Sequence, residues 1–443
     1  MTHISANDRV HARLVRTAAA VLILGAAACG DFLVAENPGA VEEPDVTNAA
    51  YVNLIANGPI GTFQDAVDDV WYWNSQFTDE LYNRAVFSEE GQIDRRELYT
   101  DMSYISAFMY SPLQRARFMG EDAARRLVLI LGDSASSDLR VARSLAYAGH
   151  AYVLLGETFC GTPINLSAPK PSDEMFADAI AKFDSAITIA TAAKVRLQAM
   201  TTVNANAVAA ADSVRLFALV GAGRAALNRN DKSAAIAYAQ QVIAANANFL
   251  FFAYYSDNTS AQRHRVYDRL QLGSNANLLN TPFAAMATDP RVPRIVSTTA
   301  RNGIPLAPSA YSTYNGAIPG APFAAEMRAR LASTLEARYI VAEAQGPVAA
   351  TLTFVNERRA AGNQAAVALV GDALMAELRD QRGRDFYLDG HRLGDLRRYR
   401  QFYNVDLFPK GPYPGSTTGQ AYDETITCWP LPRNEVNGNP NIP

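Results

Sequence analysis

The sequence predicts a mainly α-helical chain made of paired helices, interrupted by one long irregular segment. Residues 138–158 carry apolar side chains at positions i, i+3, i+4 and i+7, which is the period of an amphipathic helix. The same period returns in residues 173–190, 214–227 and 232–245. Residues 249–322 lack it and are rich in Asn, Ser, Pro and Tyr. A helical body with an irregular insertion is therefore expected.

Alanine and glycine occupy the positions where consecutive helices of this body are expected to touch. Small side chains allow close approach, so each consecutive pair is predicted to pack as an antiparallel hairpin. The pattern resembles tetratricopeptide-repeat hairpins, whose stacked pairs bury a shared core. We expect such repeats over residues 111–246 and again over residues 331–400, on either side of the insertion.

Helices are also expected before the repeats. Residues 47–57 and the aromatic-rich residues 62–80 are predicted as two separate helical segments. Pro112 suits the first turn of a helix over residues 111–131, because the N–H that proline lacks would be unpaired there. The Asn230–Asp231 pair is predicted to cap the helix of residues 232–245.

The N-terminus has the features of a secretory signal. His11, Arg13 and Arg16 form a basic head, and residues 18–28 are an apolar run too short to cross a bilayer. The small residues 25–28 precede Cys29, an arrangement that resembles the lipobox of bacterial lipoproteins. This resemblance implies a signal peptide over residues 1–28, a lipid on Cys29 and a tether over residues 29–46. The alternative is an ordinary secretory signal that happens to contain a cysteine.

Composition limits the partners of the remaining residues 47–443, which we expect to form a single domain. A formal net charge of −4 over the full 443-residue chain argues against nucleic-acid binding. Once Cys29 is lipidated, Cys160 and Cys428 remain, and an exported chain meets an oxidising compartment in which they can pair. Two unrelated buried thiols are the alternative, since sequence spacing does not establish proximity.

Residues 378–398, LRDQRGRDFYLDGHRLGDLRR, resemble the C-terminal signature of the SusD/RagB family. Gln381 and Asp385 stand where that family commonly has Glu, and Leu393–Gly394 replaces the usual Trp–Phe, which predicts a looser contact under that helix. Other matching segments lie along the whole mature chain: residues 142–152, 161–164, 430–435 and 439–441.

The resemblance implies a tetratricopeptide-like scaffold with an irregular ligand face and an anchor on the outer membrane, facing the exterior. It further implies a partner, a SusC-like TonB-dependent transporter, and a ligand that is a glycan or a peptide. Within the signature, Arg382, Asp385, Arg392 and Asp395 are predicted to form structural ion pairs, because opposite charges recur about one turn apart.

The cluster at Trp71, Trp73 and Asn74 is a first candidate for ligand binding. The flat apolar face of a sugar stacks on an aromatic ring, while nearby amides and carboxylates bind its hydroxyls. On a helix Trp71 and Trp73 point about 200° apart, so at most one can face a ligand. Core packing is the alternative for each tryptophan. Asp79 and Glu80 resemble a pair in the family for which a helix-packing role is expected.

The insertion supplies a second set of candidates, because binding residues concentrate on loops that a rigid scaffold holds. Arg263, His264 and Arg265 are candidate hydrogen-bond donors to a ligand. The aromatic candidates are Tyr254, Tyr255, Tyr267, Tyr311 and Tyr314. Any one of these tyrosines can instead be simply exposed or packed on the surface.

The sequence predicts no catalytic residue, no metal site and no cofactor. It contains no G-x-S-x-G, H-E-x-x-H, P-loop or C-x-x-C motif, and its five histidines do not cluster. The preferred interpretation is a lipid-anchored protein that binds an oligomeric nutrient, with a glycan favoured, and delivers it to the transporter without chemistry. A periplasmic adapter that binds a partner protein through its helical face is the alternative.

Overall fold

The computed structural model describes residues 48–85, 87–269, 275–278, 280–286, 288–292, 300–301, 304–305, 328–414, 416 and 418–442. The predicted signal peptide, Cys29 and tether lie outside the described residues, as do Tyr311 and Tyr314. Contacts group Ala49–Pro443 into one compact unit, which is described here by itself.

The described part of this unit is mainly helical, as predicted. The α-helices are α2 (Val52–Phe77), α3 (Ser88–Arg95), α4 (Ser111–Leu131), α5 (Leu139–Thr158), α6 (Ser172–Gln198), α7 (Ala205–Asn228), α8 (Lys232–Ala245), α9 (Arg265–Tyr267), α10 (Thr334–Gln345), α11 (Ala349–Ala361), α12 (Gly371–Asp385), α13 (Arg392–Tyr403) and α14 (Arg433–Gly438). Short turns of 3-10 or π helix lie at Ala49–Tyr51, Ile105–Tyr110, Gly132–Ser137, Ser260–Gln262 and Pro282–Ala285.

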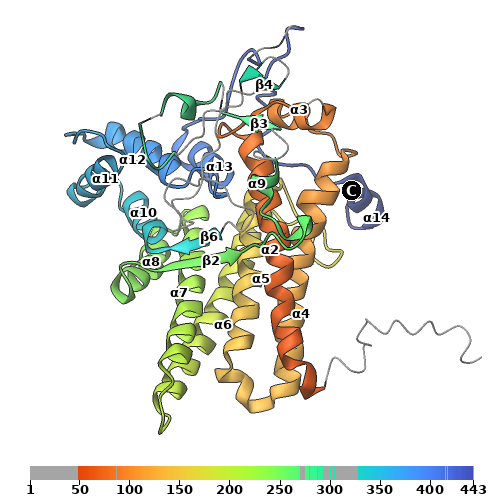
Figure 1. Ribbon diagram of the computed structural model, residues 1–443, viewed down its shortest axis with the longest axis vertical. Helices are drawn as coiled ribbons and strands as arrows, with labels where there is room; N and C mark the ends of the chain where they lie inside the picture. Colours follow the sequence, from red (N-terminus) through yellow and green to blue (C-terminus); the bar gives the residue numbers. More distant parts are fainter. Residues whose placement is uncertain are drawn as a thin grey trace, which may run out of the picture. The chain divides into compact units, whose positions relative to one another are not determined.

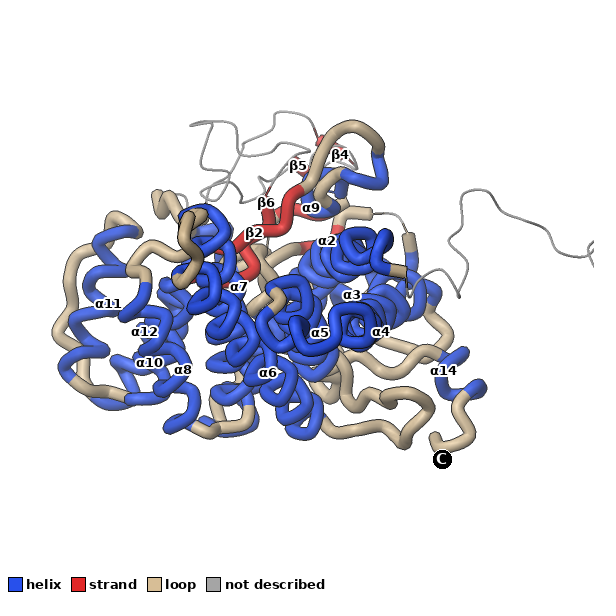
Figure 2. The backbone as a smooth tube through the Cα atoms, turned by 90° about the horizontal axis from the view of Figure 1, so that it is seen from below, coloured by secondary structure: helices blue, strands red, loops and turns tan. Residues whose placement is uncertain are grey.

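The long helices form a series of antiparallel neighbours (Figure 1). Each of α4 to α7 packs against the next, α8 packs on α7, and α10 continues the series by packing on α8. In the view of Figure 2, the α10–α12 group lies at one end of this helical array and α4 near the other. The predicted scaffold of paired antiparallel helices is therefore confirmed.

Close packing of these hairpins depends on small residues. A Cβ atom on Gly149 of α5 would lie 2.6 Å from the Phe183 ring of α6, and one on Gly221 of α7 would lie 2.3 Å from it. Both distances are far below van der Waals contact, so the ring fills the space between three helices only because two glycines leave room for it.

The region of the predicted insertion contains short strands. The strands are β1 (Tyr82–Asn83), β2 (Leu250–Tyr254), β3 (Ala276–Asn277), β4 (Ala300–Arg301), β5 (Ile304–Pro305) and β6 (Arg328–Ser333). They pair antiparallel as β1–β3, β2–β6 and β4–β5. Figure 2 shows β2, β6 and α9 on one side of the helical array. Of the predicted insertion, the described segments β2 and α9 lie on that side.

One helix, α2, replaces the two segments predicted for residues 47–57 and 62–80. The helix continues through Pro59 and the glycines that flank it. The Thr62 hydroxyl donates to the carbonyls of Gly58 (3.0 Å) and Pro59 (3.3 Å). Burial of the following four turns against α4, α5 and α13 outweighs the local cost of proline inside a helix.

Helix α7 is the one described helix whose length and apolar composition would suit a membrane crossing. Half of that apolar window is buried, and α7 contacts α5, α6, α8 and α10. Packing among these neighbours accounts for its composition.

The C-terminal tail is fastened to the helical array by a disulfide between Cys160 and Cys428, whose Cα atoms are 5.1 Å apart. The backbone pairs beside the bridge: the Cys160 N–H donates to the Trp429 carbonyl (3.0 Å) and the Trp429 N–H to the Thr158 carbonyl (2.8 Å). The pairing that the sequence left open is thus formed, and it fixes residues 428–429 across the end of α5.

Candidate functional site

A groove of about 480 Å³ brings together two segments that lie far apart in the sequence. One wall is the middle of α2, and the other is the chain from the end of β2 to the start of α9. We call this cavity the tyrosine groove. Its lining residues are Gly61, Gln64, Asp65, Asp68, Tyr254, Tyr255, Ser256, Ala261, Gln262, Arg263 and Arg265.

Tyr254 is the exposed aromatic side chain of the tyrosine groove, with 62% of its surface accessible. It is the last residue of β2, where side chains alternate, so Ala253 enters the core while Phe252 and Tyr254 share the outer face. The two rings lie 6.4 Å apart, and β6 supports them through the register pair Tyr254 and Arg328. A rigid strand therefore presents an open aromatic face at the edge of a polar cavity.

Tyr255 forms part of the groove wall and is held in place. Its hydroxyl donates to the Gln64 carbonyl (2.9 Å), and its ring meets the edge of His264 at 4.7 Å. The Gln64 side-chain amide makes no hydrogen bond to any described residue. Two of the predicted tyrosines thus line one cavity. The Gln64 amide next to them can both donate and accept hydrogen bonds.

The floor of the groove joins α2 to α9 through two adjacent carboxylates. The Arg265 N–H donates to Oδ2 of Asp68 (2.7 Å), and the Arg265 guanidinium lies 3.1 Å from Oδ1 of Asp69. Burial raises the pKa of Asp69 to about 6, although Arg265 opposes the rise. Burial and the nearby Asp69 charge raise the pKa of Asp68 well above its usual range. In formal charge, Asp65 and Asp68 of the lining balance Arg263 and Arg265.

The other charges of the groove are compensated. Asp65 pairs with Arg115, and Arg263 pairs with Asp257. The Ser256 hydroxyl donates to the Gln262 side-chain oxygen (3.0 Å). A polar, nearly neutral lining with one open aromatic ring suits an uncharged ligand with many hydroxyls, because stacking and hydrogen bonds can act together.

Trp71 and Trp73 lie in the core, which is the alternative that the sequence left open. Trp71 is 4% exposed, and Trp73 is fully buried between Tyr72 and Tyr104, at ring-centroid distances of 4.8 and 4.9 Å. Both sides of this part of α2 are covered, so the helical wheel could not select an outward face. Neither tryptophan offers a surface to a ligand in this structure.

Asn74 also lies in the core, and its expected role as a ligand contact is corrected. Its Oδ1 accepts a hydrogen bond from the Trp429 indole (2.9 Å), and its Nδ2 donates to the Thr158 hydroxyl (3.3 Å). The amide therefore joins α2, the end of α5 and the C-terminal tail. His264 is likewise buried: its Nδ1 accepts from the Val266 N–H (3.2 Å) at the start of α9, so it is not a surface donor.

The backbone of Tyr267 belongs to α9, and its side chain lies outside the described residues together with Tyr311 and Tyr314. The sequence analysis missed Gln64, Asp65, Asp68 and Gln262 as groove residues. The first three have helical spacing on α2, but nothing in the sequence indicates that residues about 190 positions away lie opposite them.

The signature segment forms a buried network of ion pairs, as predicted for Arg382 and Asp395. Oδ2 of Asp395 accepts from Nε of Arg382 (2.7 Å) and Oδ1 accepts from Arg398 (2.7 Å), while Arg398 also binds both carboxylate oxygens of Glu343. Burial works against Asp395, but Arg382 and Arg398 hold the pKa of its carboxyl far below the usual range. These ion pairs join α10, α12 and α13.

The other two charges predicted to pair, Arg392 and Asp385, bind residues outside the signature. The Arg392 guanidinium binds both carboxylate oxygens of Asp79, which lies just after α2. Asp385 binds Arg358 of α11, at 2.7 and 2.8 Å. The expectation of a looser contact at Leu393–Gly394 is wrong: a Cβ atom on Gly394 would lie 2.6 Å from the Glu157 carboxyl carbon. The absence of a large side chain brings α13 close to α5.

Glu80 fastens the turn that precedes α13. Its Oε1 accepts from the Leu388 N–H (2.9 Å) and its Oε2 from the Ser75 hydroxyl (2.9 Å). Burial raises the pKa of this carboxyl to about 8. The folded protein therefore binds this proton more tightly than the unfolded chain does, and the wild type loses stability as pH rises from about 4.5 to 8.

Glu80→Gln removes this titration and can keep both hydrogen bonds. Between pH 5 and pH 9 the unfolding free energy of the wild type is expected to fall by at least about 1.4 kcal/mol relative to that of Glu80→Gln. Glu80→Ala leaves the buried Leu388 N–H unpaired, at a cost of about 1–3 kcal/mol. Urea unfolding at both pH values measures the effect, and a difference independent of pH would contradict it.

The fold was compared with those of solved structures. A SusD superfamily protein from Bacteroides vulgatus is 13% identical, with a TM-score of 0.65 over 88% of this chain and 99% of that one. The SusD fold is therefore the fold of this chain. A SusD-like carbohydrate binding protein from Bacteroides fragilis is 14% identical, with a TM-score of 0.58 over 90% and 99% of the two chains. A SusD/RagB family protein from Bacteroides thetaiotaomicron is also 14% identical, with a TM-score of 0.58 over 88% and 94%.

At this level of identity the likeness establishes the fold alone. No protein-family model and no curated protein matches the sequence. The SusD fold agrees with the resemblance of residues 378–398, and the buried network in that segment explains what those charges do in it.

Proposed function

We propose that this protein binds a neutral oligomeric glycan in the tyrosine groove and does not transform it. The observation that carries the proposal is the exposed Tyr254 ring at the edge of a cavity lined by amide, carboxyl, hydroxyl and guanidinium groups. The SusD fold supports it, because a protein that shares this fold is described as carbohydrate binding. A cavity of about 480 Å³ accommodates a small number of sugar rings, and its open side leaves room for a longer chain.

The test is a binding panel of neutral, acidic and amino glycans, with short peptides as the second ligand class. For the glycan that binds, Tyr254→Ala is expected to weaken binding about tenfold, since a lost stacking contact costs about 1.4 kcal/mol, whereas Tyr254→Phe keeps the ring and the affinity. Tyr99→Ala is the matched control, because Tyr99 is 54% exposed and lines none of the cavities described. Unchanged binding in Tyr254→Ala would contradict the site, and a product shortened by the protein would contradict the absence of chemistry.

We further propose that a lipid on Cys29 anchors the protein on the outer membrane, facing the exterior, where it passes its ligand to a SusC-like TonB-dependent transporter. The lipobox-like residues before Cys29 support the anchor. Protease added to intact cells is expected to digest the protein, and Cys29→Ser is expected to release it from the membrane fraction. Full protection from protease would instead favour the periplasmic adapter.

A further inference from the structure

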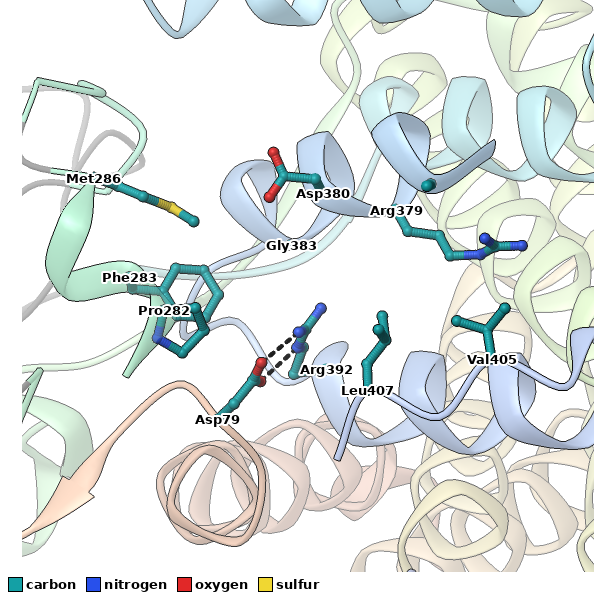
Figure 3. A pocket seen from close by; sticks show the side chains of 11 residues that line it. Asp79, Pro282, Phe283, Met286, Arg379, Asp380, Gly383, Arg392, Val405 and Leu407 are labelled. Carbon is teal, nitrogen blue, oxygen red and sulfur yellow. Dashed lines mark hydrogen bonds and ion pairs between the residues drawn. The ribbon is translucent and has the colours of Figure 1, made fainter. Parts of the chain in front are cut away.

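A second cavity, of about 300 Å³, lies between the signature helices and the chain around Pro282 (Figure 3). We call it the α12–α13 pocket. It shares no lining residue with the tyrosine groove. Its lining residues are Asp79, Pro282, Phe283, Met286, Ala376, Arg379, Asp380, Gly383, Arg392, Val405 and Leu407.

The cavity has apolar walls on opposite sides. Figure 3 shows Phe283 and Met286 at one side, and Val405 and Leu407 at the other. Phe283 is buried, so its ring is a fixed part of the wall, whereas Leu407 is 40% exposed. An apolar body of a small ligand would be covered from both sides here.

Arg379 supplies a positive charge that the described residues leave uncompensated. Its guanidinium lies 5.3 Å from the ring centroids of both Tyr399 and Tyr403, and its Nε is buried without a hydrogen-bond partner among these residues. No carboxylate of the described chain forms an ion pair with it. The two rings hold the guanidinium in position, but they do not neutralise it.

The other charges of the pocket are already paired. Arg392 binds both carboxylate oxygens of Asp79, as Figure 3 shows, and Asp380 accepts from Nε of Arg384 (2.8 Å). In Figure 3 the Asp380 carboxylate lies on the side of Met286, and the Arg379 guanidinium on the side of Val405. Among the residues that the structure describes, the pocket is therefore polarised, with the unpaired Arg379 guanidinium at one end.

We propose that the α12–α13 pocket binds a small organic monocarboxylate with an apolar body. The carboxylate accepts hydrogen bonds from the Arg379 guanidinium, whose planar fork matches a carboxylate. The apolar body lies between the Phe283–Met286 wall and the Val405–Leu407 wall. A single unpaired cation favours a monoanion, because a dianion would bring a second charge that no described residue at this end of the pocket compensates. The proposal is independent of glycan binding in the tyrosine groove.

The probes are 3-phenylpropionate and its neutral isostere 3-phenylpropionamide, with binding followed by calorimetry on the full mature chain. The acid is expected to bind at least about tenfold more tightly than the amide, as a charge-assisted hydrogen bond would give. Arg379→Gln is expected to abolish that preference. Arg400→Gln is the control: Arg400 lies on α13, its side chain is 42% exposed, and it is not part of the pocket.

One further variant and one further probe complete the test. Leu407→Trp fills the opening from an exposed position and is expected to block the acid even if Arg379→Gln does not fold. Tighter binding of N-acetylphenylalanine than of 3-phenylpropionate would identify a peptide C-terminus as the source of the carboxylate. Tighter binding of 3-phenylpropionate would identify a free acid. Either order of affinity supports the site. Equal affinity for acid and amide, no binding of the acid, or unchanged acid binding in folded Arg379→Gln or Leu407→Trp would overturn it.

Discussion

Asp395→Asn is expected to lower the free energy of unfolding by about 3–5 kcal/mol, the largest effect of any single substitution considered for this protein. Asp395 lies between Arg382 and Arg398, and each arginine is nearly fully buried. The amide keeps the shape of the side chain but removes the charge that compensates two guanidinium groups. Arg398 retains Glu343, whereas Arg382 loses the one carboxylate that pairs with it in the described structure.

Chemical unfolding of Asp395→Asn and the wild type measures this loss. Asp380→Asn is the matched control, since Asp380 also pairs with an arginine of α12 but its side chain is 41% exposed. Exposed pairs of this kind contribute at most about 0.5 kcal/mol. Equal, small effects of the two substitutions would show that the buried network does not stabilise the packing of α10, α12 and α13.

Gly390→Ala is expected to destabilise the protein by about 3–4 kcal/mol, from two causes. Gly390 has φ +78°, a region that costs an L-residue about 1 kcal/mol. In addition, a Cβ atom would lie 1.9 Å from the Trp71 indole, and neither the turn nor the buried ring can move freely, so overpacking adds about 2–3 kcal/mol. The backbone at Gly390 of the signature thus packs directly against the Trp71 ring of α2.

Two variants separate these causes. Gly411→Ala has a similar φ of +75° with no atom within 4 Å of the added Cβ, so it is expected to show the backbone cost alone. Trp71→Leu removes the ring that the Cβ would strike, and Gly390→Ala is expected to cost less in that background than in the wild type. Additive effects of Trp71→Leu and Gly390→Ala would contradict the contact.

The helical architecture could be predicted because its signals are local. Apolar periodicity, proline at a helix start and small residues between hairpins each act over a few turns, and the Asp231 side chain caps α8 as expected by accepting from the Ala234 N–H (3.0 Å). The ion pair of Arg382 and Asp395 could also be anticipated, because its members lie close together in the sequence. The binding of Arg392 to Asp79, more than 300 positions away, could be suspected only from the family resemblance.

The candidate site was predicted only in part, for a physical reason. A helix that is covered on all sides has no apolar stripe to distinguish buried from exposed positions, and the last turns of α2 are of this kind. The sequence therefore left both core packing and ligand contact open for Trp71 and Trp73, and a ligand contact was predicted for Asn74. Tyr254 and Tyr255 were found because they are aromatic residues of the irregular insertion, but the wall they face on α2 follows from tertiary packing alone.

The contacts that stabilise the fold are largely separate from the residues that line the tyrosine groove. Buried ion pairs, the Cys160–Cys428 disulfide and the Gly390–Trp71 contact fix the helices against one another. The groove lies on the side of the helical array that carries β2 and α9, and few of its lining side chains take part in those contacts. Substitutions at Tyr254 are accordingly expected to change binding and leave stability unaffected.

A crystal structure with the best-binding glycan of the panel tests the central claim most directly. We expect a sugar ring stacked on Tyr254, with its hydroxyl groups within hydrogen-bond distance of Gln64 or Gln262. A glycan bound elsewhere on the protein, with the tyrosine groove empty, would contradict it.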